Sequence, residues 1–559
     1  MSCPSLRLGA MGVLLLAGSA CRNEDAYLGG SKGTYRCEAR CEFEQGAPAD
    51  AGDWFFNPES ERGKAPQIVY PLDGAVHPRD LRQLTVQFRR GRSDFQVFRV
   101  RVEAAGAGVA YDFFTPCLAV GDDGCRYMLS GRVWDDARAE LVGKAAVLTV
   151  TGATALHGVM KSSPPVSLDL VEGNLENKGF YYWTTVNNYV DDKSTAGIYR
   201  LPFGADQAEP FIMPNTKTNT RQCGACHSVS RDGSTIAFTA RDIEGGPEDQ
   251  RSGSLVAALT AQPEIHVIDA ATPGTYDSSM MALSTDGKRV LVAYDQQLVL
   301  RSSEANGSIP GGAVIASLSK ADLGGKIGYF PEFSPDDRAV ALTLTLPEQT
   351  DSAIAVRAGD IAVIDVDLSN GTFGSPRTLV PDTGDFHFYP TWSPNGDYIA
   401  FASAPHGAGD DGNPRKSYDQ KLAHLQLVRV EDGTVFDLGN ATHEDGKWST
   451  YPKFAPFTSG SPTLSFLTFN SKIDYGLIQD NSAKPDAQKV AQLWMSAIDV
   501  ARLPEDPSSP PIWLPFQDPT QPGHLGLWTK DVKCRTDVGG SPCAFGQVCV
   551  NQVCLVRPK

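Results

Sequence analysis

The sequence has little positive charge and no basic cluster, and its N-terminal apolar run is short. Its 559 residues contain 50 Lys and Arg against 66 Asp and Glu, which gives a formal net charge of −16. Because phosphate backbones are bound by basic surfaces, this balance argues against a nucleic-acid-binding protein. The apolar run, residues 8–17, is too short to cross a bilayer as a helix.

Common catalytic motifs are also missing. The chain has no H-E-x-x-H and no phosphate loop of the form G-x-x-x-x-G-K-[ST], so the sequence predicts no zinc-protease site and no P-loop nucleotide site. Hydrophobic residues make up 41% of the chain, which is enough to bury sizeable cores. The sequence does contain one C-x-x-C-H motif, within residues 222–228, Q-C-G-A-C-H-S.

The C-x-x-C-H stretch has the spacing at which a c-type haem is attached. Two thiols, here Cys223 and Cys226, add to the haem vinyl groups, and the adjacent His227 supplies an axial nitrogen to iron. The sequence therefore predicts one covalently bound haem c. A disulfide with an incidental His is the alternative. A zinc site is less favoured, because no second Cys pair stands at zinc-finger spacing.

Residues 1–20 have the pattern of an export signal, with Arg7 ahead of the apolar run and small residues after it. The end of this segment, L-A-G-S-A-C, resembles a bacterial lipoprotein signal, which implies a lipid anchor on Cys21 and a cell-envelope location. Gly18 stands where such signals usually carry Leu, and simple cleavage to a free periplasmic protein is the alternative. Arg22, rather than Asp, after the cysteine favours the outer membrane by the sorting rule of such lipoproteins.

The remaining cysteines fit an oxidising compartment, which is also where c-type haem is attached. Cys3 leaves with the signal, and eight cysteines outside the signal, the anchor and the haem motif stand in close local groups. An even number in such groups predicts disulfides. The expected pairs are Cys37 with Cys41 and Cys117 with Cys125. A further group of four is also expected to form disulfides, but the sequence does not show which cysteine pairs with which; these are Cys534, Cys543, Cys549 and Cys554.

The regions before the haem motif differ in composition. Residues 21–66 are rich in Gly, Glu and Ala without a sustained period and predict a linker behind the anchor. Residues 67–170 hold short β-branched and aromatic runs split by turn residues, which predict an antiparallel sandwich. This segment resembles an immunoglobulin-like module but lacks its Cys…Trp…Cys signature. His77 and His157 are expected in its surface loops.

From about residue 179 the chain repeats itself. Each copy has an apolar residue, Ser, a variable residue, Asp or Asn, and then an apolar strand, which predicts a β-hairpin with an Asp-Gly-type turn. Four copies and a weaker fifth begin at Val229, Leu283, Phe333, Trp392 and Tyr451.

These copies resemble the WD40-like repeats of the TolB-type β-propeller family. The resemblance implies an all-β fold, with a propeller of six blades, alternatively seven, over residues 176–530. Strands from both ends of this segment are expected to share one blade and close the ring, with P-I-W-L-P-F-Q and H-L-G-L-W-T-K contributing from the far end. Residues 531–559 predict a small disulfide-rich module.

When the repeats are aligned, His227 occupies the same position as Pro331 and Pro390, which is expected to lead into the innermost strand of each blade. Haem is therefore expected at the mouth of the central channel, where propellers place their sites. Candidates for the other axial ligand are His387, on a blade three steps away and hence opposite, and His524, near the ring-closing strand. Met213 and His443 are weaker candidates.

Three functions are compatible with these patterns. The first is a cell-envelope haem protein for electron transfer or redox sensing, with a redox partner or envelope protein as its partner; two imidazole ligands would leave iron no vacant position. The alternative is a non-redox binding propeller that recognises an envelope protein or glycan. An enzyme with an open haem position ranks last, because it requires a vacant sixth site that no sequence pattern shows.

Overall fold

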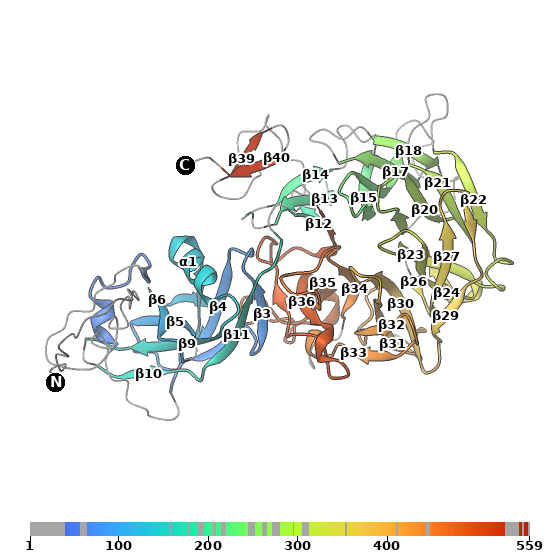
Figure 1. Ribbon diagram of the computed structural model, residues 1–559. Coiled ribbons are helices and arrows are strands. Elements are labelled where there is room, and N and C mark those ends of the chain that lie inside the picture. The colour runs from blue at the N-terminus through green and yellow to red at the C-terminus, as the bar shows by residue number, and fades with distance from the viewer. Residues whose placement is uncertain are drawn as a thin grey trace, which may run out of the picture.

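The computed structural model describes most of the chain. The described residues are 40–55, 64–104, 106–156, 158–175, 178–186, 195–203, 205, 208–213, 220–243, 252–259, 265–270, 280–294, 296–303, 312–352, 355–409, 412–442, 448–530, 547–550 and 553–556. Strands dominate them, as predicted, and Figure 1 shows a sandwich beside a propeller. Among the described helices, none has the length and apolar character needed to cross a membrane.

The N-terminal sandwich is built from two sheets. Its strands are β1 (Cys41–Phe43), β2 (Gln67–Tyr70), β3 (Ala75–Pro78), β4 (Leu84–Arg89), β5 (Val97–Ala104), β6 (Val109–Thr115), β7 (Leu118–Val120), β8 (Gly124–Leu129), β9 (Ala145–Ala153), β10 (Met160–Ser162) and β11 (Val166–Val171). The larger sheet has the order β1-β6-β5-β9-β11-β3, with β10 paired to β9, and the smaller has the order β2-β4-β8-β7. Alternate residues of β5, Phe98, Val100 and Val102, are fully buried in one core with Phe88 of the smaller sheet.

A helix that the sequence reading missed also belongs to the sandwich. It is α1 (Gly131–Leu141), and it contacts β5 and β6. Its apolar residues Val133, Trp134, Ala137 and Leu141 follow helical spacing and are all buried, so the helix covers part of the sandwich core.

His77 lies in β3 rather than in a surface loop, so the prediction for this residue is wrong. Its side chain is 0% exposed and packs edge-on against Trp134 of α1, with 5.9 Å between the ring centroids. The helix covers the strand that would otherwise be open to solvent. His157 lies outside the described residues.

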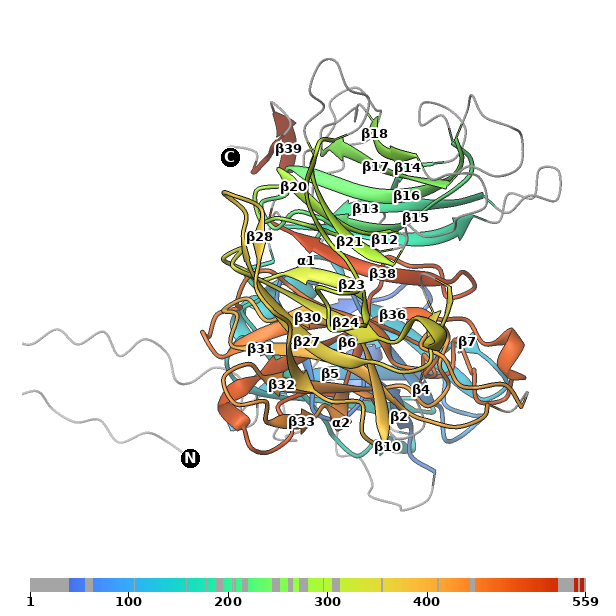
Figure 2. The same ribbon diagram turned by 90° about the vertical axis from the view of Figure 1, so that its right-hand side faces the viewer.

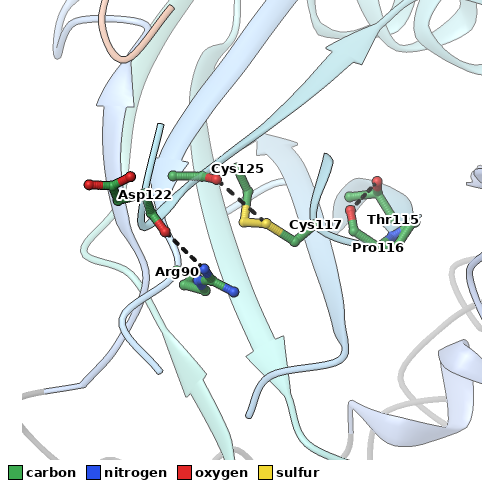
Figure 3. The surroundings of a disulfide bond; sticks show 7 residues. Arg90, Thr115, Pro116, Cys117, Asp122 and Cys125 are labelled. Atoms are coloured by element: carbon green, nitrogen blue, oxygen red, sulfur yellow. Dashed lines mark hydrogen bonds between the residues drawn. A yellow bond between two sulfur atoms is a disulfide. The ribbon is translucent and has the colours of Figure 1, made fainter. Parts of the chain in front are cut away.

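The disulfide between Cys117 and Cys125 is confirmed and joins β7 to β8, with 5.0 Å between the two Cα atoms (Figure 3). Cys41 is also disulfide-bonded, and its expected partner, Cys37, lies outside the described residues. At the C-terminus Cys549 and Cys554 are opposite residues of the hairpin β39 (Gln547–Val550) and β40 (Val553–Val556). Three further cysteines with predicted roles lie outside the described residues: Cys21, Cys534 and Cys543.

In the part of the chain that the structure describes, the propeller has six blades, each with four main strands that follow one another from the channel outward. Blade 1 consists of β15 (Thr220–Val229), β16 (Thr235–Ile243), β17 (Ser252–Ala258) and β18 (Ile265–Ala270), and blade 2 consists of β19 (Met281–Leu283), β20 (Arg289–Tyr294), β21 (Gln297–Ser302) and β22 (Val314–Leu318). Blade 3 consists of β23 (Ile327–Phe333), β24 (Ala339–Thr345), β27 (Asp360–Asp367) and β29 (Arg377–Val380), and blade 4 consists of β30 (Asp385–Trp392), β31 (Tyr398–Pro405), β32 (His424–Arg429) and β33 (Val435–Asp437). Blade 5 consists of β34 (Thr450–Phe454), β35 (Leu464–Ser471), β36 (Gln492–Asp499) and β37 (Ile512–Trp513), and blade 6 consists of β38 (Gly523–Thr529), β12 (Gly179–Val186), β13 (Thr195–Pro202) and β14 (Glu209–Ile212).

The ring is closed by a blade shared between the two ends of the propeller. β38 pairs with β12 from Gly179↔Thr529 to Thr184↔Gly523, and Figure 2 shows β38 beside β12. The innermost strands contact one another in the order β15, β19, β23, β30, β34, β38 and back to β15. The closing role predicted for H-L-G-L-W-T-K is therefore confirmed. The closing role predicted for P-I-W-L-P-F-Q is wrong, because its strand, β37, pairs with β36 as the outer strand of blade 5.

The repeated Ser builds the turn that ends each innermost strand. In blades 1 to 4 its hydroxyl donates to the Asp or Asn two residues later and accepts from the backbone N–H five residues later, which satisfies polar groups of the turn. Each of the four bonds from the Ser hydroxyl to the Asp or Asn side-chain oxygen measures 2.7 Å. These hydroxyls belong to Ser230, Ser284, Ser334 and Ser393.

The sandwich is joined to blade 5 by hydrogen bonds as well as by packing, and Figure 1 shows it beside the orange strands. The hydroxyl of Tyr70 accepts from the backbone N–H of Trp513 at 2.9 Å. The Oε1 of Gln87 accepts from the backbone N–H groups of Leu477 and Ile478, at 2.6 and 3.0 Å. The sandwich is therefore fixed against the propeller at this junction.

Candidate functional site

The entry to the central channel is marked by a backbone irregularity repeated from blade to blade. In the innermost strands Cys226, Phe330, Tyr389, Tyr451 and Leu525 have φ values of 48°, 54°, 57°, 52° and 52°. Such positive φ values are uncommon for residues with a Cβ, and they accompany β-bulges, which shift the strand register at these points. Cys226 of the C-x-x-C-H motif thus occupies the position of the channel aromatics in other blades, as the repeat alignment predicted.

In three of the blades the residue after the bulge lines the channel. His227 takes this place in blade 1, and Pro331 and Pro390 take it in blades 3 and 4. Together with residues from the other blades they enclose a cavity of about 80 Å³. His227 therefore lies at the propeller axis, where the sequence analysis expected it.

Aromatic rings narrow the channel at the level of the bulges. The rings of Tyr389 and Tyr451 are stacked with centroids 4.0 Å apart, and the Tyr389 hydroxyl donates to that of Tyr451 at 3.0 Å. Phe330 meets Tyr389 edge-on at 4.4 Å. Burial raises the pKa of both tyrosines, and the nearby Cys226 thiol acts in the same direction. The thiol therefore faces a neutral aromatic wall.

A charged cluster lies in the same cavity. The Glu332 carboxylate lies 2.5 Å from Lys453 Nζ and 3.7 Å from the Arg231 guanidinium, and it accepts from the Thr391 hydroxyl at 2.9 Å. The three charged side chains are 15 to 21% exposed, so water screens them only partly. The charge of Asp337 also acts on Arg231, so each of the two cations has a carboxylate near it.

His227 is the buried polar group that this arrangement leaves without a well-formed hydrogen bond. Its side chain is 3% exposed, and neither ring nitrogen makes a hydrogen bond of ordinary geometry with the described residues, although the Tyr181 backbone lies near enough to raise its pKa. Burial, and after it the charge of Lys453, lowers its pKa to about 4. The imidazole is therefore neutral near pH 7, and a neutral imidazole with a free lone pair is the form that ligates a metal.

β15 carries the residues of the C-x-x-C-H motif, whereas the channel cavity is too small to enclose a haem. Cys226 is partly exposed and His227 follows it, next to the channel, while Cys223 lies earlier on β15 opposite Arg241 of β16. Pockets that bury whole ligands measure roughly 300–1,000 Å³, several times the cavity volume of about 80 Å³. A macrocycle attached to these residues would not be held within the cavity.

The other two predicted iron ligands are not among the residues that line the channel cavity. The ring of His387 bonds through Nδ1 to the Ser403 hydroxyl at 3.0 Å and packs edge-on against Phe401 in its own blade. His387 does lie on blade 4, three steps around the ring from blade 1 and so opposite the haem motif. The blade that carries His387 therefore lies opposite His227, but the His387 side chain does not line the channel cavity beside it.

His524 stands on the closing strand, in the blade next to β15. Its Nδ1 accepts from the Asn470 amide at 2.6 Å, and its ring lies 5.4 Å from that of Trp183. Burial lowers its pKa to about 4. In the part of the chain that the structure describes, no three His, Cys, Asp or Glu side chains are grouped to hold a metal ion. His443 lies outside that part, and for His266 only the strand is described.

Sequence reasoning missed the charged cluster and one aromatic residue of the wall, Tyr451. Tyr451 could have been found, because T-Y-P-K-F repeats the aromatic-Pro pair seen at Tyr389 and Phe330. Glu332 and Lys453 each follow such a Pro by one residue, a shared position that the alignment contained. Their ion pair had no signal in sequence, because it joins residues 121 positions apart.

No family model and no curated protein matches this chain. Solved structures with similar folds include one described as TolB from Agrobacterium tumefaciens, with 14% identity over 62% of this chain and 97% of that chain and a TM-score of 0.30. The periplasmic gluconolactonase of Pseudomonas aeruginosa matches with 12% identity over 58% and 80%, at a TM-score of 0.30. A nidogen/laminin complex matches with 10% identity over 63% and 98%, at a TM-score of 0.35. At these identities and scores they say nothing of function, and it is the six blades themselves that make this chain a β-propeller.

Proposed function

We propose that the protein is a monohaem β-propeller of the bacterial cell envelope, in which a c-type haem on β15 serves electron transfer or redox sensing. His227 carries the proposal. The C-x-x-C-H motif puts at the propeller axis a buried imidazole whose nitrogens make no hydrogen bond of ordinary geometry with the described residues, the Tyr181 backbone being its one near polar neighbour. A buried polar group without a partner costs roughly 1–3 kcal/mol, and an iron–nitrogen bond would remove that cost.

The chain's own residues have distinct parts in this proposal. Cys223 and Cys226 would form the two thioethers, and His227 would be the axial ligand. Burial, and after it the charge of Lys453, lowers the pKa of His227 and so keeps its lone pair available. The haem, when bound, supplies one-electron redox chemistry.

The test is expression of the full chain with the cytochrome c maturation genes. Wild type is expected to give a haem-stained band that survives a denaturing gel, because thioethers are covalent. Cys223→Ser and Cys226→Ser are expected to weaken or abolish the band. A matched control, the double variant Cys117→Ser/Cys125→Ser, removes two sulfurs from the sandwich and should keep it. An unstained wild type, beside a control cytochrome that matures, would refute the proposal.

His387 and His524 remain the predicted sixth ligands, and spectra can separate them. A low-spin wild type that becomes high-spin only in His387→Ala would assign the ligand to His387, which would have to leave Ser403. The same change only in His524→Ala would assign it to His524. A high-spin wild type would exclude both and favour an open haem position.

The envelope location is part of the proposal and rests on residues 1–22 of the sequence. Labelled palmitate is expected to enter wild type and not Cys21→Ser, since the lipid would be attached to this thiol. Equal labelling of both would exclude Cys21 as the anchor, and no labelling of either would indicate a secreted protein. A redox partner or envelope protein would then meet the haem at the membrane surface.

A further inference from the structure

A short segment of blade 4 reaches across to the blades on either side of it, and it is called here the cap. It consists of residues 417–421, in the connection between β31 and β32. Its first residue is anchored to blade 3. The Ser417 N–H donates to the Val356 carbonyl at 2.8 Å, and the Ser417 hydroxyl accepts from the Val356 N–H at 3.0 Å. Because Ser417 is also fully buried, this end of the cap is fixed.

The other end of the cap is held by blade 5 through two ion pairs. Asp419 pairs with Lys472 at 2.7 Å, and Lys421 pairs with Asp486 at 2.9 Å. The chain turns at Asp419, whose φ of 52° lies in the left-handed region that Asp and Asn tolerate better than other residues with a Cβ. The cap is therefore tied to both of its neighbouring blades.

The cap also reaches the channel mouth. The Ser417 side chain hydrogen-bonds with Tyr389, one ring of the stacked pair that narrows the channel. Burial lowers the pKa of His524 on the closing blade, and the charge of Asp419 opposes that effect, so Asp419 lies near this ring. A segment of blade 4 thus meets groups of blades 3, 5 and 6, which places it over the mouth of the channel.

Tyr418 of the cap lies near the Cys226 thiol. Tyr418 is 44% exposed. Burial of its hydroxyl, and after it the charges of Asp419 and Cys226, raise its pKa. The same thiol acts on Tyr389 and Tyr451, which stand below the cap in the channel wall. Three tyrosines therefore surround one partly exposed cysteine, two from the channel and one from the cap.

We infer that Tyr418 covers the Cys226 thiol and forms the outer wall of the position in which a group attached to this thiol is held. The stacked pair Tyr389 and Tyr451 forms the inner wall. Walls of aromatic rings suit a planar aromatic group, because such rings pack face to face with an offset or edge to face. The inference rests on the proposed function only for the nature of that group, the haem, whereas the covering of the thiol is a property of the chain without it.

The test is the rate at which N-ethylmaleimide modifies Cys226, read from the mass of the peptide that contains it. The parent protein is the full chain with Cys223→Ser, made without the cytochrome c maturation genes, so that neither a disulfide to Cys223 nor haem masks the thiol. The parent should react roughly tenfold more slowly when folded than in urea, and Tyr418→Ala should react roughly fivefold faster than the folded parent. Tyr398→Ala, at a partly buried position of β31 outside the cap, should react as the parent does.

A second variant loosens the cap without touching the Tyr418 ring. Asp419→Asn removes the ion pair with Lys472 but keeps a residue that tolerates the left-handed backbone, and it should react roughly twofold faster than the parent. Its matched control is Asp432→Asn, which removes a pair with Arg429 at 3.0 Å; the two carboxylate side chains are 47% and 46% exposed.

Two results would overturn the inference: a folded Tyr418→Ala that reacts like the parent, or a parent that reacts as fast folded as it does in urea. Where Tyr418→Ala loses the circular dichroism spectrum of the parent, an unaccelerated Asp419→Asn overturns it instead. Haem staining is measured on the wild type and thiol modification on protein without haem. A failure of the cap experiment is therefore distinct from a failure of the haem proposal.

Discussion

Acid is expected to destabilise the sandwich through His77. This side chain is 0% exposed, its Nε2 lies 3.4 Å from the Gln83 carbonyl, and its ring packs against Trp134. Burial, and after it the charge of Arg138, lowers the pKa of His77 from 6.5 to about 3. The folded protein therefore holds the imidazole neutral at any pH above about 3.

The sign and size follow from linkage between folding and protonation. Below pH 6.5 the unfolded chain takes up a proton at His77 and the folded chain does not, so the free energy of unfolding falls as the pH falls toward about 3. Each pH unit in this window costs about 1.4 kcal/mol. Lowering the pH from about 7 to about 5 should thus remove about 2 kcal/mol of stability.

The assay is urea unfolding of wild type and His77→Phe at these two pH values. The phenyl ring cannot titrate, so the loss of stability between the two pH values should be about 2 kcal/mol smaller in the variant. Effects of all other titrating groups are common to both proteins and cancel. His424→Phe, at a partly exposed position of β32, is the matched control and should behave as wild type. Equal losses in wild type and His77→Phe would refute the reasoning.

Three further substitutions test the channel and the hairpin. Glu332→Ala takes a carboxylate away from two partly buried cations and should lower the free energy of unfolding by about 3 kcal/mol, as measured in urea; a change below about 1 kcal/mol would show that water solvates them. Tyr451→Phe keeps the stack with Tyr389 but loses the hydroxyl pair, so a melting experiment should show a loss of about 1 kcal/mol, and no loss would argue against that hydrogen bond. Cys117→Ser/Cys125→Ser opens a loop with a sequence separation of 8 residues and should cost roughly 2–3 kcal/mol by loop-closure entropy, whereas unchanged stability in reducing and oxidising buffer would refute it.

The sequence allowed the propeller to be predicted because its information is local and repeated. The Ser-x-Asp turns, the apolar strands and the alignment of His227 with Pro331 all depend on residues close together in the chain. The orientation of His387 could not be obtained in the same way. A bulge shifts the register between Phe388 and Thr391, so counting back from Pro390 does not tell which way a side chain points.

Other features were missed because they depend on tertiary contacts or on a different periodicity. The helix α1 interrupts a region that was interpreted only for strand alternation, although Val133, Trp134 and Ala137 have helical spacing. The burial of His77 results from this helix. The hollow between the tip of the β7–β8 hairpin and blade 5 brings residues near 120 beside residues near 480, a pairing for which one sequence holds no signal.

The closing blade has a consequence for the order in which the molecule can be assembled. Gly179 pairs with Thr529, so the first and last strands of the propeller meet only after 350 residues have followed. Any chain that emerges from a translocon N-terminus first would expose the β12 edge until β38 arrives. β15, which carries C-x-x-C-H, pairs with β13 through Ala196 and Cys223, and β13 is separated from that open edge by β12 alone. A truncation that removes β38 should therefore leave an aggregation-prone, protease-sensitive chain rather than a five-bladed propeller.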